Sequence, residues 1–357
     1  MSITIRDVAA AAGVSVATVS RVANGATNAY PVRPKTRERV LEAIAALGYR
    51  PNDNARGLLS KKSGLIGLVV PDISNTYYPE VSRGIEDVAN GHGYKLMFCS
   101  TDRLIDRASA YIEALLLKRV DGLVIVGGGD EIQLTAATVA TYDTKVVFIG
   151  RPSASFSTVR IDNIGAARDA TGHLLGLGHS RIGFISAATS SNTVPERRRG
   201  YREALEAQGI KFDSDLAVNG GFTEAGGYSA ARRLLELEHR PSAIFAANDR
   251  MALGAMAAVS DLGLRVPEDV AIVGFDDVPM SGYLRPSLTT VSVSAQELGA
   301  RAMEVLLKDI NGRPALRRVR VKTRLVVRDS CGASLRARSA TGGVPATNEA
   351  RLPDLVN

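Results

Sequence analysis

The chain has 357 residues, of which 45% are hydrophobic and 23% charged, and its formal net charge is +7. This length allows two or three folding units, and the composition is that of a soluble globular protein. No apolar run reaches the roughly 18 residues that a membrane span needs, and the first residues do not form the apolar segment of a secretory signal. With only Cys99 and Cys331, neither a disulfide framework nor a Cys-rich metal site is expected. We therefore expect a cytoplasmic protein with no membrane partner.

The excess positive charge is concentrated near the N-terminus. Residues 1–62 contain 10 Lys and Arg against 4 Asp and Glu, a net charge of +6, and residues 331–357 have a net charge of +1. The intervening 268 residues contain 31 groups of each sign. A small basic region beside a neutral body is typical of a nucleic-acid-binding module joined to a second domain. An ordinary solvated surface would spread the excess along the chain instead.

The basic region predicts three short helices. Thr4 and Asp7 have the spacing of a capping box at the start of the first helix, Gly13 supplies a turn, and Ser15 is placed to cap the second helix. Pro34 suits the first position of the third helix, where apolar residues recur at helical spacing until Gly48. The predicted helices cover residues 5–12, 16–23 and 34–47. Three helices with a Gly turn between the first two indicate a helix-turn-helix, a layout used to bind DNA.

From Leu65 onward, short apolar runs alternate with stretches of helical periodicity. The strand-like runs are at residues 65–70, 96–99, 122–126, 146–149, 182–185, 243–246 and 271–274. This alternation predicts parallel sheets with helices on both faces, and about 265 residues fit two doubly wound α/β subdomains better than one. Ligands of such folds bind in a cleft at the carboxyl ends of the strands.

These patterns predict four regions in chain order. They are a helix-turn-helix headpiece over residues 1–50, a hinge over 51–62, a core over 63–330, and a tail over 331–357. In the core we expect an N-subdomain of residues 63–161 and 292–323 and a C-subdomain of residues 162–291 and 324–330. The tail is rich in Ser, Thr, Gly, Ala and Arg and shows no periodicity, so we expect it to be disordered.

Several motifs occur together in a characteristic order. The headpiece contains Thr4-Ile5-Arg6-Asp7-Val8-Ala9, Ala12-Gly13-Val14-Ser15, Thr18-Val19-Ser20-Arg21-Val22 and Leu47-Gly48-Tyr49-Arg50-Pro51-Asn52, and the core contains Val120-Asp121-Gly122, Ala247-Asn248-Asp249-Arg250-Met251-Ala252-Leu253-Gly254 and Val273-Gly274-Phe275-Asp276-Asp277. Over residues 3–330 the chain closely resembles the lac/galactose repressor (LacI/GalR) family. The resemblance implies a helix-turn-helix headpiece, a short hinge and a periplasmic-binding-protein-like core that dimerises. Most members are repressors that respond to sugars, and one branch responds to nucleobases.

The resemblance places the second helix in the major groove of DNA, with Val16 and Ala17 at the main specificity positions. Both side chains are short and apolar, so they can contact thymine methyl groups or exclude bases by shape. Arg21 can make a bidentate contact to guanine, worth roughly 1–3 kcal/mol of discrimination. Contacts to the DNA backbone are expected from Thr4, Ser15, Thr18, Ser20, Asn24, Tyr49 and Asn52. Alternatively, Ser15 and Ser20 only cap and solvate their helices.

In the hinge, Leu58 aligns with the leucine that family members insert into the minor groove at the centre of a palindromic site. Asp53 and Asn54 replace apolar residues common in this segment, and Gly57 lowers helix propensity by about 1 kcal/mol relative to Ala. We therefore expect the hinge helix to form only when paired on DNA. Alternatively, Leu58 is a linker residue covered by the core.

Seven core residues match the effector-contacting positions of the family. They are Tyr77, Tyr78, Asp162, Arg197, Phe222, Asn248 and Asp276. Polar groups that converge beside aromatic faces suit a polyhydroxylated ligand, so we expect a sugar or sugar derivative, with a nucleobase as the alternative. Other interpretations are core packing for Tyr78 and Phe222 and a structural cap for Asp276. Cleft closure would rotate the subdomains and change the spacing of the two hinges in a dimer.

Other classes of protein fit less well. The sequence has no dinucleotide-binding or P-loop glycine motif and no nucleophile elbow, and its four histidines lack metal-ligand spacing, so we expect no catalysis, cofactor or metal. A secreted sugar-binding protein would need a signal peptide and no basic headpiece. An activator, or a regulator with a protein corepressor, stays open because the sequence does not show whether the effector releases DNA or promotes binding. We predict a repressor that binds a palindromic operator as a homodimer. A dimer is favoured over a tetramer because the C-terminal residues contain no leucine heptads.

Overall fold

The computed structural model describes residues 3–23, 32–49, 62–127, 134–187, 193–312 and 316–340, with only the backbone for residues 337–340. It divides into two compact units, residues 1–64 and 65–357, and each is described by itself. Three residues predicted to contact DNA, Asn24, Asn52 and Leu58, lie outside the described residues together with nearly all of the predicted hinge.

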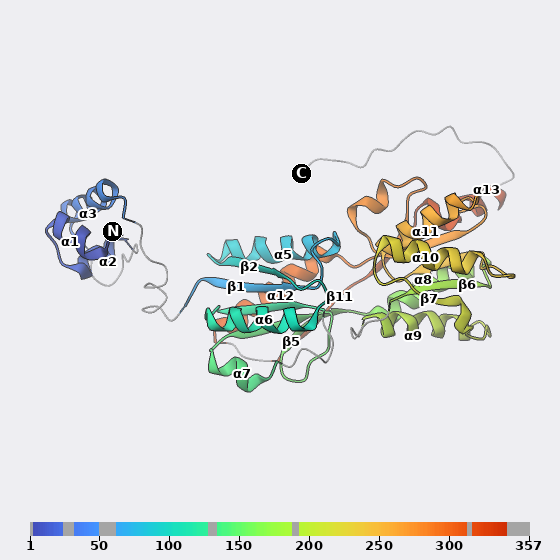
Figure 1. Cartoon of the computed structure of the whole chain (residues 1–357), viewed down its shortest axis with the longest axis horizontal. Coiled ribbons are helices and arrows are strands. Elements are labelled where there is room, and N and C mark those ends of the chain that lie inside the picture. The colour runs from blue at the N-terminus through green and yellow to red at the C-terminus, as the bar shows by residue number, and fades with distance from the viewer. Residues whose placement is uncertain are drawn as a thin grey trace. The chain divides into compact units, whose positions relative to one another are not determined.

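The first unit contains three helices with the bounds that the sequence predicts (Figure 1): α1 (Ile5–Ala12), α2 (Val16–Ala23) and α3 (Pro34–Leu47). The Thr4 backbone N–H donates to Asp7 Oδ2 at 2.8 Å, so the predicted capping pattern is present. Gly13 and Gly48 follow α1 and α3 at φ of 59° and 61°, a left-handed backbone that glycine adopts without strain. Val8, Val19 and Val40 are fully buried at the centre of a small apolar core.

The second unit begins with a lobe built on a parallel six-stranded sheet of order β11-β5-β4-β3-β1-β2. Its strands are β1 (Leu65–Val70), β2 (Lys95–Ser100), β3 (Gly122–Val126), β4 (Lys145–Ile149), β5 (Ser157–Ile161) and β11 (Arg318–Val321). Its helices are α5 (Tyr77–Gly91), α6 (Ile105–Leu117), α7 (Ala136–Thr141) and α12 (Ala295–Ile310). Helices α5 and α12 cover one face of the sheet, and α6 and α7 cover the other (Figure 1). We call this the N-lobe.

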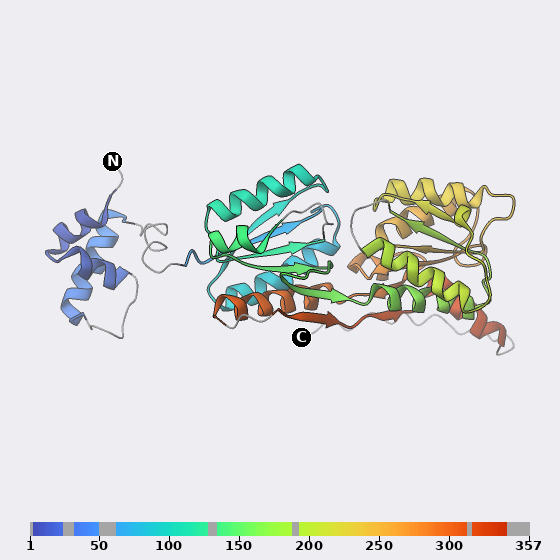
Figure 2. The ribbon, with the colours of Figure 1, turned by 90° about the horizontal axis from the view of Figure 1, so that it is seen from below.

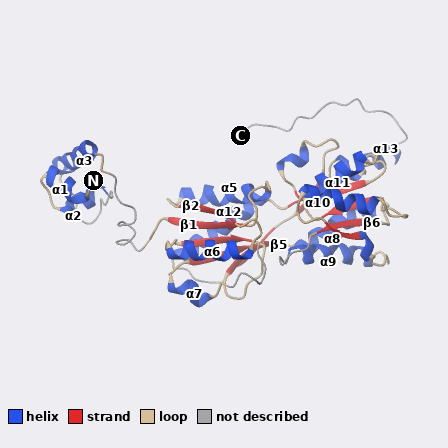
Figure 3. Cartoon of the chain, in the orientation of Figure 1, coloured by secondary structure: helices blue, strands red, loops and turns tan. Residues whose placement is uncertain are grey.

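The second lobe, the C-lobe, has a six-stranded sheet of order β12-β10-β9-β8-β6-β7, in which only β12 is antiparallel to its neighbour among the described strands. Its strands are β6 (Ile182–Ser186), β7 (Ala217–Asn219), β8 (Ala243–Ala246), β9 (Ala271–Asp276), β10 (Thr289–Ser292) and β12 (Arg324–Val326). Its helices are α8 (Asn163–Gly176), α9 (Thr193–Glu206), α10 (Glu224–Leu235) and α11 (Asp249–Asp261), with short 3₁₀ turns η1 (Ser214–Leu216), η2 (Pro279–Gly282) and η3 (Asp329–Cys331). Helices α8 and α9 pack together on one face, and α10 and α11 on the other (Figure 3).

The described chain passes between the two sheets at three places (Figure 2). These are the connections from β5 to α8, from β10 to α12, and from β11 to β12. Each lobe is therefore assembled from distant parts of the sequence, and the predicted fold class, a helical headpiece with two doubly wound sheets, is confirmed. Ligand sites in such sheets lie at the carboxyl ends of the strands, and several N-lobe strands end toward the space between the lobes.

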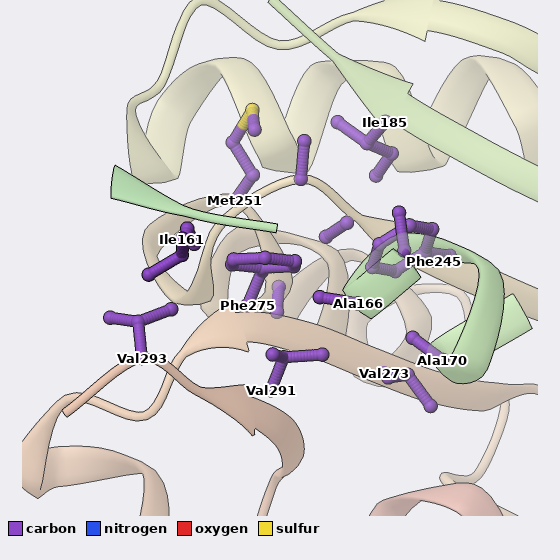
Figure 4. Close-up of a cluster of buried hydrophobic side chains, with 14 of the residues drawn as sticks. Ile161, Ala166, Ala170, Ile185, Phe245, Met251, Val273, Phe275, Val291 and Val293 are labelled. Atoms are coloured by element: carbon purple, nitrogen blue, oxygen red, sulfur yellow. The ribbon is translucent and has the colours of Figure 1, made fainter. Parts of the chain in front are cut away.

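The C-lobe core is dense with aromatic and small side chains (Figure 4). Phe245 and Phe275 are fully buried, with ring centroids 6.5 Å apart, and Met251 is also fully buried. Phe275 is the last residue but one of β9, so its ring lies where the core meets the end of the sheet. Close packing on this ring gives a rigid base for the polar residues around it.

Two glycines let α5 and α12 approach closely. A Cβ atom on Gly84 would lie 1.9 Å from the backbone oxygen of Gln296, and one on Gly299 would lie 2.0 Å from that of Val81. Neither distance is possible for a real side chain, so the packing of these helices depends on glycine at both positions.

The C-terminal tail differs from the sequence-based expectation of disorder. Residues 333–340 form helix α13 (Ala333–Ala340). Cys331 is fully buried, with Sγ 3.2 Å from His173 Nε2, and Arg336 donates to the carbonyl of Gly176 at 2.6 Å. The prediction of disorder from residue 331 was therefore wrong for residues 331–340, because tertiary contacts hold a segment with little periodicity. Residues 341–357 lie outside the described part.

Candidate functional site

A cleft of about 1140 Å³, including its opening to solvent, lies between the two lobes. The N-lobe contributes the carboxyl ends of β1, β3, β4 and β5 and the first residues of α5 and α6, and the C-lobe contributes residues around the starts of α9 and α11 and the end of β9. The cleft therefore has walls from both lobes and occupies the position at which this fold binds ligands.

Six of the seven residues predicted to contact an effector line this cleft: Tyr77, Tyr78, Arg197, Phe222, Asn248 and Asp276. Asp162 does not line it. This residue is exposed and caps α8, where its Oδ1 accepts the backbone N–H of Gly165 at 3.0 Å. The neighbouring Asn163 is buried and lines the cleft instead. The interpretation of Asp162 as a cleft residue was wrong by one position.

Arg197 is the central polar group of the cleft. It lies on the first turn and a half of α9, its side chain is only 8% exposed, and its guanidinium carbon lies 3.6 Å from the centroid of the Phe275 ring. Nε donates to Asn163 Oδ1 at 3.1 Å, and Nη1 donates to the carbonyl of Ala247. These contacts hold one face and one edge of the guanidinium, so the group is preorganised to donate to a ligand.

Asp276 ends β9 and faces Arg197, with Oδ1 3.6 Å from Nη2. Its backbone φ of 118° is in a region that residues other than glycine rarely adopt, and the next residue, Asp277, also has a positive φ. Burial raises the pKa of Asp276 to about 7, although Arg197 beside it favours the ionised form. A carboxyl group on a strained backbone, with a pKa near neutral pH, is typical of a binding site.

The aromatic residues form two walls of the cleft. Tyr77 and Tyr78 begin α5 with ring centroids 5.1 Å apart and planes at 73°, and burial raises the pKa of both hydroxyls, so both stay neutral donors. Phe222 is half-buried on the opposite lobe, with a positive φ of 64°. Apolar rings that face polar groups can stack on the apolar face of a sugar ring or on a planar base.

Asn248 has a structural role beside its place in the cleft. It caps α11, since its Oδ1 accepts the backbone N–H of Met251 at 2.9 Å, and its Nδ2 lies 3.5 Å from the carbonyl of Phe222. The adjacent Asp249 is buried away from the cleft and accepts hydrogen bonds from Ser281 and Val278. The Asn-Asp pair therefore fixes the start of α11 at the cleft wall.

Among the polar cleft residues that were not predicted as effector contacts, Asn163 and Arg103 have the most informative contacts. Asn163 follows β5, and its Nδ2 donates to Glu196 Oε2 at 2.9 Å, which links α8 to the helix that carries Arg197. Arg103 belongs to the loop after β2, and its guanidinium lies 4.4 Å from the centroid of the Phe222 ring. Their signal in the sequence is their position just beyond the carboxyl end of a strand.

The second candidate site is the exposed face of α2 in the headpiece. Val16 is 41% exposed, Ala17 and Arg21 are exposed, and Val19 and Val22 are buried, so the predicted specificity residues face solvent. Arg21 Nε donates to the carbonyl of Ala17 at 3.3 Å, and among the described residues no carboxylate pairs with Arg21. Its remaining guanidinium donors are therefore available for a base edge.

Other predicted DNA contacts lie on the same small unit. Thr4 and Ser15 are exposed, and Thr18, Ser20 and Tyr49 are half-buried. Ser15 Oγ accepts the backbone N–H of Thr18 at 3.2 Å, so Ser15 is a helix cap as predicted. This role does not exclude a phosphate contact, because the exposed hydroxyl has further hydrogen-bonding capacity.

The described residues form no group of three or more His, Cys, Asp and Glu side chains suited to hold a metal ion. In the same described part, no helix is both long enough and apolar enough to span a membrane.

Two parts of the chain match known protein families. Residues 4–52 match the family of bacterial regulatory proteins called the lacI family, and residues 171–331 match the periplasmic binding protein-like domain. Among curated relatives, catabolite control protein A of Priestia megaterium is 39% identical over 317 residues, which cover 87% of this chain and 93% of the relative. The ribose operon repressor of Halalkalibacterium halodurans is 39% identical over 332 residues, 92% of this chain and 96% of the relative.

Solved structures show the same relationship over nearly the whole chain. The lac repressor dimer bound to operator and the anti-inducer ONPF is 29% identical, covers 93% of this chain and 99% of its own, and has a TM-score of 0.83. The complex of the transcriptional regulator CelR with cellobiose is 33% identical, covers 92% of this chain and 99% of its own, and has a TM-score of 0.68. These proteins are regulators of transcription rather than enzymes, and with a DNA-binding headpiece and an effector-binding type of core, this chain belongs to the lacI family of bacterial regulatory proteins.

Proposed function

We propose that the protein is a cytoplasmic repressor of transcription that binds a palindromic operator as a homodimer. We propose further that a sugar or sugar derivative bound in the cleft between the lobes controls this binding. The observation that carries the proposal is the cleft itself, since Arg197 and Asp276 of one lobe face Tyr77 of the other across it. The cellobiose of the similar CelR complex supports a sugar ligand.

DNA recognition in this proposal begins with α2. Val16 and Ala17 would contact thymine methyl groups in the major groove, and Arg21 would donate two hydrogen bonds to one guanine. Two copies of the headpiece would read the two halves of a palindrome. The net charge of +6 over residues 1–62 would supply the attraction to phosphate, which weakens as salt concentration rises.

Control by a ligand follows from the connections between the lobes. A ligand that contacts residues of both lobes favours the arrangement in which those residues are close. In a dimer, a change in the angle between the lobes would change the distance between the two segments that lead to the headpieces, and thereby the stability of DNA binding. The experiment below measures whether the ligand weakens or strengthens DNA binding.

Support for the dimer comes from apolar side chains that the single chain leaves exposed. In the C-lobe, Met280 is 57% and Tyr283 65% exposed, and Phe98 on the edge strand β2 is 40% exposed. Analytical ultracentrifugation of the wild-type protein should give a dimer. A monomer at micromolar concentration would contradict this part of the proposal.

The function is tested by fluorescence anisotropy on a palindromic duplex selected from a random pool, at two salt concentrations, with and without a panel of sugars and nucleobases. We expect tight specific binding with a steep negative dependence on salt, and a shift in Kd with at least one compound. In the variant Arg197→Met the specific DNA binding should remain and the shift should disappear. If no duplex is selected over random DNA, the proposed function is wrong.

A further inference from the structure

The cleft has an excess of positive charge. Three described residues that line it are ionisable to a charged form near neutral pH: Arg103, Arg197 and Asp276. Arg197 and Asp276 face each other at 3.6 Å and balance one another. Arg103 has no counterpart among the described lining residues.

Arg103 is placed by a tight turn after β2. Asp102 and Arg103 both have a left-handed backbone, with φ of 50° and 62°. The Arg103 backbone N–H donates to the carbonyl of Pro71 at 2.9 Å, and the N–H of Leu104 donates to the carbonyl of Thr101 at 3.0 Å. Two successive residues other than glycine in this conformation are costly, and such strain is found where a side chain must be aimed at a site.

Two carboxylates on the segments beside Arg103 are paired with other groups. Asp102 pairs with Arg107, which lies on the first turn of α6. Asp72 accepts two hydrogen bonds from Ser74 and pairs with Arg250 at 3.1 Å. Among the described residues, no carboxylate lies within ion-pair distance of the Arg103 guanidinium.

The Arg103 side chain contacts the opposite lobe. Arg103 belongs to the N-lobe, and its guanidinium lies over the ring of Phe222 in the C-lobe, 4.4 Å from the centroid. Stacking uses the face of the planar group. The Tyr78 hydroxyl takes a hydrogen bond from Arg103, and the other in-plane N–H donors at the edge are left for a partner. The exposed Arg103 side chain is therefore held in place without a close ion pair among the described residues, and the carboxyl groups of Asp72 and Asp276 interact with its charge from a greater distance.

We propose that the effector of this protein is an anion, a sugar acid or sugar phosphate, whose carboxylate or phosphate accepts hydrogen bonds from the Arg103 guanidinium while its hydroxyl groups contact Arg197 and Asp276. This inference rests on the proposed function in placing the effector in the cleft. The inference adds that the positive charge of Arg103 selects an anionic ligand over a neutral one. A planar guanidinium edge matches two oxygen atoms of a carboxylate or phosphate, and such charge-assisted pairs are stronger than bonds to a neutral hydroxyl.

Arg103 would also help the ligand to hold the two lobes together. An anion bound to its edge, with hydroxyl groups on the C-lobe, ties together two lobes that Arg103 and Phe222 already bridge. Partial protonation of Asp276 near neutral pH would increase the positive charge of the cleft and favour the same class of ligand.

The first test uses inorganic phosphate as a probe on the full chain at constant ionic strength. The unfolding midpoint is measured for the wild-type protein, for Arg103→Gln, and for Lys118→Gln, which removes one exposed positive charge of the same lobe at the far end of α6. We expect phosphate to stabilise the wild-type protein and Lys118→Gln more than Arg103→Gln. An equal effect in all three proteins would overturn the proposal, because the anion would then bind elsewhere.

The second test compares neutral sugars with their anions by isothermal titration calorimetry: glucose with gluconate and glucose 6-phosphate, and ribose with ribose 5-phosphate. We expect the anionic member of one set to bind about tenfold or more tightly than the neutral sugar, and Arg103→Gln to remove this preference. Gluconate and the phosphates separate a carboxylate from a phosphate ester as the source of the anion. A neutral sugar that binds as tightly as its anions, with affinity unchanged in Arg103→Gln, would overturn the proposal.

The same compounds are then added to the anisotropy experiment with operator DNA. A neutral sugar that shifts DNA affinity equally in the wild-type protein and in Arg103→Gln would leave the proposed function standing and contradict the anionic effector. An anion that binds through Arg103 without any effect on DNA affinity would keep the assignment of the cleft and contradict control by the ligand.

Discussion

Arg250 of the C-lobe and Asp72 of the N-lobe form an ion pair between the two lobes, with Nη1 3.1 Å from Oδ2. Their side chains are only 16% and 20% exposed. Glu224 holds the guanidinium of Arg250 through two hydrogen bonds of 2.7 Å, so the group is presented to the N-lobe in a fixed orientation. The pair stabilises the arrangement in which the two walls of the cleft are close.

Replacement of Asp72 by Asn should weaken effector binding by roughly tenfold, because a partly buried charge-assisted hydrogen bond that favours the closed arrangement is lost. The unfolding midpoint should change little, since Arg250 keeps its contacts to Glu224 within its own lobe. Calorimetric titration with the effector and a thermal scan measure the two quantities. The matched control is Glu236→Gln, which breaks an exposed ion pair with Arg232 at the C-terminal end of α10. A loss of stability without a loss of affinity would show that the pair only holds the fold.

Asp276 gives the protein a specific dependence of stability on pH. Its pKa rises from 3.8 to about 7 on burial, so between these values the folded state keeps a proton that the unfolded state has released. The contribution of this bound proton to the free energy of unfolding is therefore complete below about pH 4 and is lost as the pH rises through about 7. We expect the difference in unfolding free energy between the wild-type protein and Asp276→Asn to fall over this range, by at most about 1.4 kcal/mol per pH unit. Urea unfolding at a series of pH values measures it, and a difference that rises with pH would contradict the assignment.

Arg21 should contribute to specific DNA binding far more than another headpiece cation. Arg21→Gln is expected to cost about 1–3 kcal/mol on the selected operator and to relax the preference for guanine at one position of each half-site. Lys35→Gln at the start of α3 removes the same charge and should weaken binding to all duplexes alike. Competition binding with operator variants tests both. Equal losses in the two variants would place α2 outside the major groove.

Gly84 and Gly91 offer a test of the packing between α5 and α12. A Cβ on Gly84 would meet the backbone of α12, whereas one on Gly91 would have open space. Gly84→Ala should therefore lower the unfolding free energy by about 1–3 kcal/mol or more, through overpacking. Gly91→Ala lies in the same helix and should be neutral or stabilising by about 0.4–1 kcal/mol. Chemical denaturation of both variants is the measurement, and similar values for the two would contradict the close approach.

Much of this structure could be predicted from local sequence signals. The headpiece helices have the predicted bounds because caps and turn residues such as Thr4, Gly13 and Pro34 act within a few positions. The buried strands β3, β6, β8 and β9 are continuous apolar runs, so they were also visible. The short strand β5, with sequence Ser-Thr-Val-Arg-Ile, was not singled out, because its polar residues interrupt the apolar pattern.

The cleft was predictable through motifs rather than through geometry. Resemblance to the family identified Arg197 and Asp276, but no local pattern distinguishes Asp162, a helix cap, from Asn163, its neighbour in the cleft. Arg103 was missed because it gains its place only when the turn after β2 meets the ring of Phe222, 119 residues further along the chain. Helix α13 was missed for a similar reason, since contacts such as that of Arg336 with α8 lie far apart in sequence.

The central claim is that the cleft and the headpiece are coupled, and thermodynamic reciprocity tests it most directly. The measurement is the calorimetric Kd of the identified effector for the free protein and for the protein saturated with operator DNA. If the two sites are coupled, the ratio of these constants equals the ratio of operator Kd values with and without the effector, and we expect a factor of about 5–150. Equal effector affinity in the two states would contradict the account, because binding in the cleft would then have no influence on the headpiece.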